Sequence, residues 1–114
     1  MFIESTLSPG TIERVVRPML EAAGRTVGGD VFLGHCPERV MPGKLLGNMR
    51  TLPRVCGGTT PGTRRAMAAL YRTIVTAELT ETDATTAEIV KTAENAYRDV
   101  NIAFANELAK VCEV

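Results

Sequence analysis

The sequence has no excess of either charge and no long apolar run. Thirteen lysines and arginines balance thirteen aspartates and glutamates among 114 residues. Nucleic acids and acidic membrane surfaces are bound by clusters of positive charge, so this balance argues against both as principal partners. No stretch approaches the ~18 apolar residues of a membrane-spanning helix, and no basic segment followed by an apolar one opens the chain. These absences predict a soluble, cytoplasmic protein.

Cysteine and histidine are scarce. Cys36, Cys56 and Cys112 stand at unrelated spacings, form no CxxC pair, and have a single histidine, His35, near them. A zinc site or a disulfide framework is therefore not expected. We expect all three cysteines to be small buried apolar residues.

Apolar runs and turn signals alternate along the chain in the order of an α/β fold. Short runs bounded by glycines predict strands at residues 2–6, 31–33, 54–56 and 77–80. Start and stop signals predict helices from Ser8-Pro9 to Gly24, after the turn at 42–44, from Thr60-Pro61, and from Thr85 to the chain end. The third of these should bury Met67, Leu70, Tyr71 and Ile74. The last should begin with a Thr85-x-x-Glu88 capping box.

The last predicted helix is unusually long, about 27 residues or roughly 40 Å at 1.5 Å per residue. It is too long to pack along one small sheet and indicates a spine that connects two domains or pairs two subunits. One face is apolar: Ile89, Ala93, Ala96, Val100, Phe104 and Val111. The chain starts inside an apolar run and stops inside this helix without a glycine or proline signal. We therefore expect an internal piece of a longer protein.

Opposite the apolar face, the same helix carries a polar stripe. Its members are Glu88, Lys91, Asn95, Arg98 and Asn106. Lys91, Asn95 and Arg98 follow the spacing i, i+4, i+7, so their side chains stand in a row. A polar helix face is ordinarily solvated, but asparagine is a poor helix former and the flanking Ala87, Ile102 and Ala105 are small or apolar. The pattern alone leaves a solvated face and a ligand-facing stripe both open.

Four segments carry a resemblance to a known family. They are residues 4–11 (ESTLSPGT), 36–44 (CPERVMPGK), 54–58 (RVCGG) and 85–109 (TTAEIVKTAENAYRDVNIAFANELA). In this order and spacing they resemble the nucleotide-sugar 6-dehydrogenases of the UDP-glucose/GDP-mannose dehydrogenase family. The resemblance implies that residues 1–80 are the outer, C-terminal part of a Rossmann-type NAD-binding domain. It implies that residues 81–114 begin an all-α central domain, whose long helix at 85–112 pairs two subunits into a homodimer.

The family oxidises the C6 hydroxyl of a UDP-sugar to a carboxylate in two NAD-dependent hydride transfers. The closest resemblance is to the branch that acts on UDP-N-acetyl-D-mannosamine. The same chemistry on UDP-N-acetylglucosamine or UDP-glucose is the alternative, although Pro42 stands where UDP-glucose enzymes carry a second glutamate four residues after the first. A non-catalytic helical dimerisation module is a further alternative. The family's GxGxxG motif and its nucleophilic cysteine loop are not in this sequence, so the chain by itself is expected to be inactive.

The resemblance also implies roles at the reacting end of the sugar. Lys91 corresponds to the catalytic lysine and Asn95 to its neighbour, and both would stabilise negative charge that develops on oxygen. Glu38 corresponds to a glutamate that activates water and transfers protons. No metal is implied.

Further residues are implied as binding groups. Arg39, Val40 and Arg98 correspond to substrate contacts, and Lys91 and Asn95 contact the substrate as well. Thr6 corresponds to a threonine beside the nicotinamide of NAD.

Overall fold

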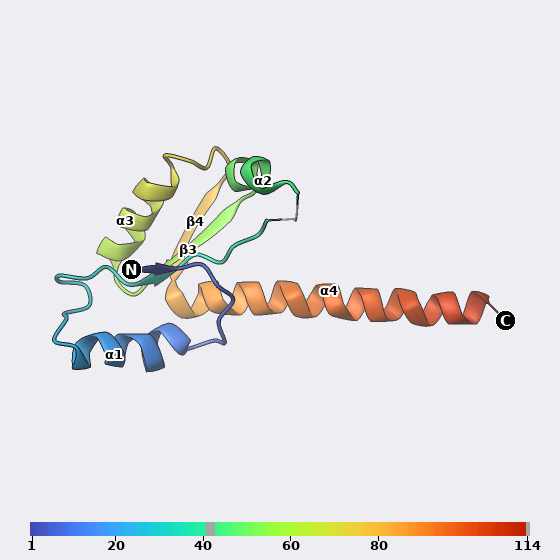
Figure 1. The fold of residues 1–114 in the computed structure, drawn as a ribbon, viewed down its shortest axis with the longest axis horizontal. Helices are drawn as coiled ribbons and strands as arrows, with labels where there is room; N and C mark the ends of the chain where they lie inside the picture. The colour runs from blue at the N-terminus through green and yellow to red at the C-terminus, as the bar shows by residue number, and fades with distance from the viewer. Residues whose placement is uncertain (41–42, 114) are drawn as a thin grey trace.

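The computed structural model describes residues 1–40 and 43–113, which form a sheet with helices on both faces and one long projecting helix (Figure 1). The strands are β1 (Phe2–Ile3), β2 (Gly34–His35), β3 (Arg54–Gly58) and β4 (Leu79–Asp83). They lie in the order β1-β2-β3-β4, and only the central pair β2–β3 is antiparallel among these strands. The helices are η1 (Ile12–Val16), a turn of π-helix that continues into α1 (Arg17–Ala22), then α2 (Leu45–Thr51), α3 (Pro61–Tyr71) and α4 (Ala84–Cys112).

The predicted α/β class is confirmed, while two strands lie elsewhere than expected. Residues 31–33 are not a strand: Val31 makes an isolated bridge to Val27, and pairing with β1 and β3 occurs at Gly34 and His35. β4 runs from Leu79 to Asp83 instead of 77–80. Its residues are mostly polar, and parallel pairing with β3 satisfies their backbone groups whatever their side chains. A search for apolar side chains therefore placed this strand too early in the sequence.

The start of α4 also differs from the predicted capping box. The helix begins at Ala84, and the Asp83 carboxylate accepts a hydrogen bond from the Thr86 N–H at 2.8 Å. Hydrogen bonds from Thr86 lower the pKa of Asp83. Thr85 is therefore not the cap, which leaves Glu88 available for another role.

Two clusters of apolar side chains cover the two faces of the sheet. Toward α3 lie Cys36, Cys56, Met67, Tyr71 and Val75. Toward η1 and α4 lie Ile12, Leu33 and Ala84. Burial of Cys36, Cys56, Met67 and Tyr71 was predicted correctly. Three positions are exposed instead: Leu70 faces solvent on α3, Ile74 lies in the turn after α3, and Cys112 is at the far end of α4.

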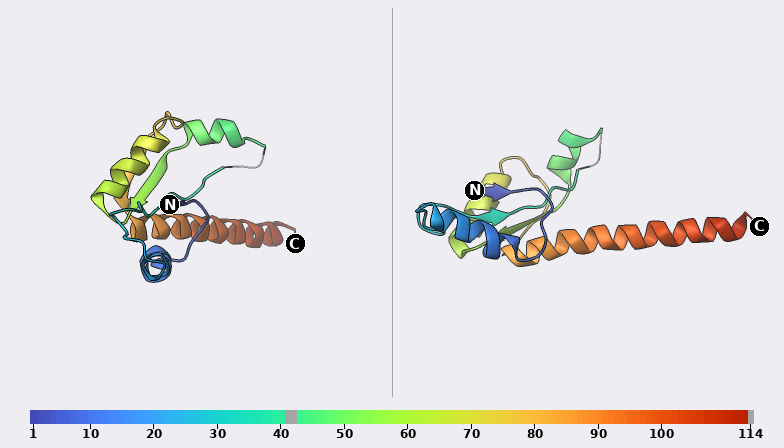
Figure 2. Two further views of the ribbon diagram at one scale, coloured as in Figure 1. Left: turned by 60° about the vertical axis from the view of Figure 1, so that its left-hand side comes forward. Right: turned by 60° about the horizontal axis from the view of Figure 1, so that its bottom comes forward.

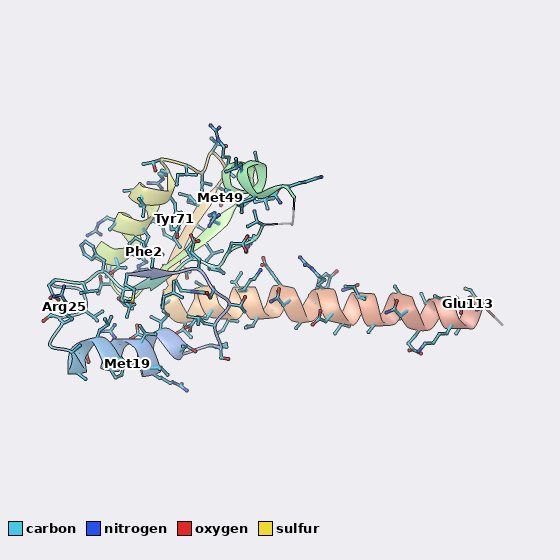
Figure 3. The ribbon with its side chains drawn as sticks, in the orientation of Figure 1. Phe2, Met19, Arg25, Met49, Tyr71 and Glu113 are labelled. Atoms are coloured by element: carbon cyan, nitrogen blue, oxygen red, sulfur yellow. The ribbon has the colours of Figure 1, made fainter. Side chains whose placement is uncertain are left out.

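In the described residues, helix α4 packs against the sheet only at its first turns. Its 29 residues extend about 43 Å, and the principal extents of the molecule are 63 × 31 × 21 Å. Within it only Ala84, Ala87 and Glu88 are buried, and the rest projects clear of the sheet in every view (Figure 2). Side chains along its distal half stand in open space as far as the labelled Glu113 (Figure 3). In the described residues, no helix combines the length and apolar character that a bilayer crossing requires.

The anchor depends on a close approach between β3 and α4. A Cβ atom added to Gly57 would lie 2.5 Å from the Cβ of Ala87 and 2.7 Å from the carbonyl oxygen of Asp83. Such distances are below van der Waals contact, and the Asp83 oxygen is backbone that cannot turn aside. Glycine at position 57 is therefore what lets the first turn of α4 lie against the sheet.

We predict that Gly57→Ala lowers the free energy of unfolding by about 1–3 kcal/mol, measured by chemical denaturation. The matched control is Gly47→Ala in α2, where an added Cβ meets nothing within 4 Å. Because alanine is the better helix former, the control should raise stability by up to about 1 kcal/mol. Equal effects of the two substitutions would contradict the close-packing argument.

Candidate functional site

A groove of about 720 Å³ runs between α4 and the segment that follows β2. From that segment and from the end of α2 it is lined by Glu38, Arg39, Val40 and Leu52. From α4 it is lined by Lys91, Glu94, Asn95, Tyr97, Arg98, Asn101, Ile102 and Ala105. The helix thus supplies a floor that is polar near the sheet and increasingly apolar farther out.

A second cavity of about 390 Å³ adjoins the first. Its walls are Glu4, Ser5 and Thr6, from the segment after β1, together with Glu38, Lys91 and Asn95. The last three residues line both cavities, so the two spaces meet at these side chains. A ligand that spans the junction would contact Lys91.

The seven residues singled out from the sequence come together at these two cavities. Arg39, Val40 and Arg98 line the larger one, Thr6 lines the smaller one, and Glu38, Lys91 and Asn95 line both. The polar stripe of α4 therefore faces a groove over these positions. Pro42, the residue used to argue about the substrate, lies outside the described residues.

Two members of the predicted stripe do not share this environment. Asn106 is exposed and is not among the lining residues. Glu88 is fully buried on the inner side of the helix. Predicting Glu88 as part of this polar surface was wrong, because it lies under the turn that precedes η1. Asn106 lies on a part of the helix surface that is open to solvent.

Arg39 crosses the groove to α4. Its Nη2 lies 2.5 Å from the Glu94 carboxylate, and its Nη1 donates to the carbonyl oxygen of Pro53 at 3.0 Å. In the described part of the chain its buried Nε has no hydrogen-bond partner. Beside it, the Glu38 carboxylate accepts a hydrogen bond from the Val40 N–H. Glu94 holds the guanidinium over the groove, a role that sequence reasoning missed because Glu94 reads as one more charge on a helix.

A polar network supports the smaller cavity from the α3 side. The Tyr71 hydroxyl donates to the Glu4 carboxylate at 2.6 Å, and Arg54 Nη1 lies 3.5 Å from the same carboxylate. The Arg54 guanidinium, only 4% exposed, stacks 5.4 Å from the centre of the Tyr71 ring. Burial and the Glu4 carboxylate raise the pKa of Tyr71. Glu4 is therefore a wall residue with a fixed carboxylate, whereas the sequence showed only a residue in an apolar strand.

The buried cysteines do not reach either cavity. Cys36 and Cys56 are fully buried in the cluster beneath α3, and neither is a lining residue. The hydrogen bond with Cys36 and burial raise the pKa of Cys56. These two thiols are packing groups, as predicted, and not nucleophiles directed at the groove.

A second buried pair of polar side chains lies on the opposite face of the sheet. Glu88 accepts hydrogen bonds from the backbone N–H groups of Gly10, at 2.5 Å, and Ile12, at 2.8 Å. His35 Nδ1 lies 2.9 Å from the carbonyl oxygen of Ile3. Burial lowers the pKa of His35, an effect opposed by that hydrogen bond and by the nearby Glu88.

Comparison with known proteins gives the same segments a family context. Residues 1–75 match the NAD binding domain of the UDP-glucose/GDP-mannose dehydrogenase family, and residues 85–114 match the central domain of that family. The chain is 43% identical over 109 residues to a UDP-N-acetyl-D-mannosamine dehydrogenase of Pyrococcus horikoshii, covering 96% of this chain and 26% of the relative. It is 49% identical over 84 residues to an NDP-N-acetyl-D-galactosaminuronic acid dehydrogenase of Ralstonia solanacearum, covering 74% of this chain and 20% of the relative.

Solved structures agree in fold. The native UDP-N-acetyl-mannosamine dehydrogenase Cap5O of Staphylococcus aureus superposes with a TM-score of 0.89 at 50% identity, covering 97% of this chain and 27% of that chain. A GDP-mannose dehydrogenase of Pseudomonas aeruginosa superposes with a TM-score of 0.83 at 26% identity, covering 93% of this chain and 24% of that chain. The chain spans about a quarter of the length of the curated relatives that it matches. With its first 75 residues in the NAD binding domain and its long helix in the central domain, this chain belongs to the UDP-glucose/GDP-mannose dehydrogenase family.

Proposed function

We propose that the chain forms part of an NAD-dependent dehydrogenase that oxidises the C6 hydroxyl of UDP-N-acetyl-D-mannosamine to a carboxylate. The observation that carries the proposal is the junction of the two cavities at Glu38, Lys91 and Asn95. One cavity extends toward Thr6 and the other toward Arg39 and Arg98. A junction of this kind suits a reaction between two bound molecules, one in each cavity.

The smaller cavity fits the nicotinamide end of NAD and not its pyrophosphate. Ser5 and Thr6 offer hydroxyl groups there. The backbone N–H groups of Gly10 and Ile12, at the turn into η1, are buried and already bonded to Glu88, so they are not free to cradle phosphate. When bound, NAD supplies the hydride acceptor for both oxidation steps. In this proposal Thr6 holds the nicotinamide end, and the larger cavity takes the sugar nucleotide.

In this proposal the junction residues stabilise negative charge on the sugar oxygen. As the C6 hydroxyl is oxidised its oxygen becomes more negative, and the Lys91 ammonium and the Asn95 amide can donate hydrogen bonds to it. Both side chains are half-buried, which strengthens such interactions relative to water. The Glu38 carboxylate, which lines both cavities, is placed to accept a proton from the hydroxyl or from an attacking water.

The larger cavity suits the remainder of a sugar nucleotide. Arg39 and Arg98 supply positive charge for phosphate oxygens, and Val40, Leu52 and Ile102 supply apolar walls. The two curated relatives reported above, at 43% and 49% identity, carry an N-acetylated sugar in their names, whereas the GDP-mannose dehydrogenase is only 26% identical. This favours an N-acetylhexosamine over glucose. The alternatives are UDP-N-acetylglucosamine and UDP-glucose. A non-catalytic dimerisation module is less well supported, because it would not need Lys91, Asn95 and Arg98 along one groove.

The test is a panel of UDP-sugars assayed by NADH formation. Activity requires this sequence in a full-length dehydrogenase, either its own or the Pyrococcus horikoshii relative with the matching segment exchanged. We expect the highest kcat/KM with UDP-N-acetyl-D-mannosamine and a lower value with UDP-glucose. Turnover of UDP-glucose in preference to every N-acetylated sugar would overturn the substrate assignment.

We predict that the two cations on α4 affect different kinetic constants. Lys91 and Arg98 are seven residues apart, roughly 10 Å along the axis, so they contact different parts of one substrate. Lys91→Ala should lower kcat at least about a hundredfold, because its interaction strengthens in the transition state. Arg98→Ala should raise the KM for the UDP-sugar and leave kcat within roughly tenfold. Steady-state kinetics measures both.

The control for these two variants is Lys110→Ala on the same helix. Lys110 is exposed, pairs with Glu107 and lines neither cavity, so both kinetic constants should stay at their wild-type values. The role of Lys91 is refuted by a Lys91→Ala enzyme with normal kcat and only a raised KM. The role of Arg98 is refuted if its variant weakens NAD more than the UDP-sugar.

We further propose that α4 pairs with the α4 of a second copy. Val100, Phe104 and Val111 are 68%, 64% and 72% exposed on the face opposite the groove. When large apolar side chains repeat along one exposed helix face of a single chain, that face is typically buried against a partner. This arrangement would also brace a helix that the sheet holds only at one end.

We predict that Val100→Asp together with Phe104→Asp converts a dimer into monomers. Burying a charge in place of each apolar side chain loses roughly 1.5–3 kcal/mol of apolar burial per site and adds the cost of desolvating the carboxylate. Sedimentation equilibrium measures the mass, and circular dichroism checks that the helix persists. The control is Val15→Asp in η1, an equally apolar and 51% exposed position outside α4. A folded double variant that keeps the wild-type mass would refute the interface.

A further inference from the structure

We propose that Glu88 is a positioning residue, which fixes the turn on the cofactor side of the site against the helix on the substrate side. The inference rests on the proposed function, because it concerns how the two cavities are held together. Glu88 itself lines neither cavity, so it would act through its neighbours and not on the substrate.

The geometry of the contact is specific. One carboxylate oxygen of Glu88 accepts the Gly10 N–H at 2.5 Å, and the other accepts the Ile12 N–H at 2.8 Å. Glu88 and Ile12 are fully buried, and Gly10 is buried as well. The bonds join residues 78 and 76 positions apart in the sequence. They therefore tie two distant segments together and do not serve as a local cap within one helix.

Both donors need this carboxylate. Gly10 and Ile12 lie where the chain turns into η1, and backbone N–H groups at the start of a helix have no partner within it. Leaving them buried without an acceptor is costly, and an acidic group is favoured near the positive end of a helix. Gly10 has a φ of +89°, a left-handed conformation that glycine adopts readily, so the turn has a shape that few other residues would maintain.

The two segments that Glu88 joins carry the junction residues. Thr6 lies four residues before Gly10 of the turn. Lys91 lies three residues after Glu88 on α4. Thr6 and Lys91 line the smaller cavity together. Any displacement of the turn relative to α4 therefore changes the separation between the two. A displacement of about 1 Å in the alignment of reacting groups can slow a reaction on the order of a hundredfold.

The packing beside Glu88 sets the direction of its side chain. Ala87, the preceding residue, is pressed against Gly57 of β3, which fixes the rotation of the first turn of α4. With that rotation fixed, the carboxylate of Glu88 has a set direction toward the turn. The sheet, through Ala87 and the side chain of Glu88, therefore fixes where the turn lies.

The test replaces Glu88 in the full-length dehydrogenase defined above. Glu88→Gln keeps the size but offers one acceptor atom in place of two, and Glu88→Asp keeps the charge but is shorter by one methylene. The matched control is Glu81→Gln on β4, which removes only an ion pair with Arg72 at 3.5 Å. The measurements are kcat, the KM for the UDP-sugar, and the isotope effect on kcat with deuterium at C6 of the sugar. Hydrogen exchange at the amides of Gly10 and Ile12 provides a readout that does not depend on activity.

We expect Glu88→Gln to lower kcat by at least about tenfold, to leave the KM for the UDP-sugar within about threefold, and to raise the isotope effect. The isotope effect rises because misaligned hydride transfer becomes the slow step, whereas loss of folded enzyme lowers kcat without changing it. Exchange at Gly10 and Ile12 should accelerate at least about tenfold. Glu81→Gln should match the wild type in every measurement. If Glu88→Gln does not fold, the same measurements are made on Glu88→Asp and the same results are expected.

Two outcomes overturn the inference. One is a folded Glu88 variant with wild-type kcat and isotope effect, and the other is failure of both variants to fold, which would show that the carboxylate serves folding alone. Inactivity of the unsubstituted enzyme on every UDP-sugar would overturn the proposed function instead. In that case the exchange rates at Gly10 and Ile12 still report whether Glu88 holds the turn.

Discussion

The contact between β3 and the first turn of α4 is the constraint on which the rest of the molecule depends. Gly57 brings the strand so close to Ala87 and to the Asp83 carbonyl that no side chain fits between them. This contact sets both the direction and the rotation of a 29-residue helix. Because one side of that helix is the floor of the groove, the contact decides which side chains face the groove and which face away. Lys91, Asn95 and Arg98 line the groove as a consequence of how Ala87 is seated.

Much of the fold follows from the sequence, because local signals there act independently of the tertiary structure. The Thr60 cap and Pro61 start α3 as predicted. The similar pair Ser8-Pro9 does not start a helix, because η1 begins only at Ile12. The long segment from residue 85 was predicted as helical from another local signal, the helical spacing of its apolar residues. The strands were harder to predict because pairing, not side-chain character, selected them. Polar β4 and the displaced β2 are held by backbone bonds to β3, which no pattern of apolar residues reports.

For the site, helical spacing in the sequence aligned the row that lines the groove, but it did not indicate the residues that hold this row in place. Helical spacing aligns Lys91, Asn95 and Arg98, and the family resemblance supplied Thr6, Glu38, Arg39 and Val40. Glu4, Glu88 and Glu94 were missed or misread. Their carboxylates act through partners far away in sequence, namely Tyr71, the turn at Gly10 and the Arg39 guanidinium. Acidic residues on helices and strands are common, and only three-dimensional pairing distinguishes these from solvated ones.

In the described residues α4 packs on the sheet through its first turns, and this has a consequence for the geometry of the groove. Arg98 lies ten residues beyond Glu88, about 15 Å along the axis, so a tilt of about 4° at the anchor moves it by about 1 Å. The near end of the groove, at Lys91, moves far less for the same tilt. The two ends of the groove therefore change shape to different extents when this helix bends. Under the function and the pairing of α4 proposed above, a second copy would stiffen the far end most. Sugar-nucleotide affinity would then depend on protein concentration, while the maximal rate per folded site would not.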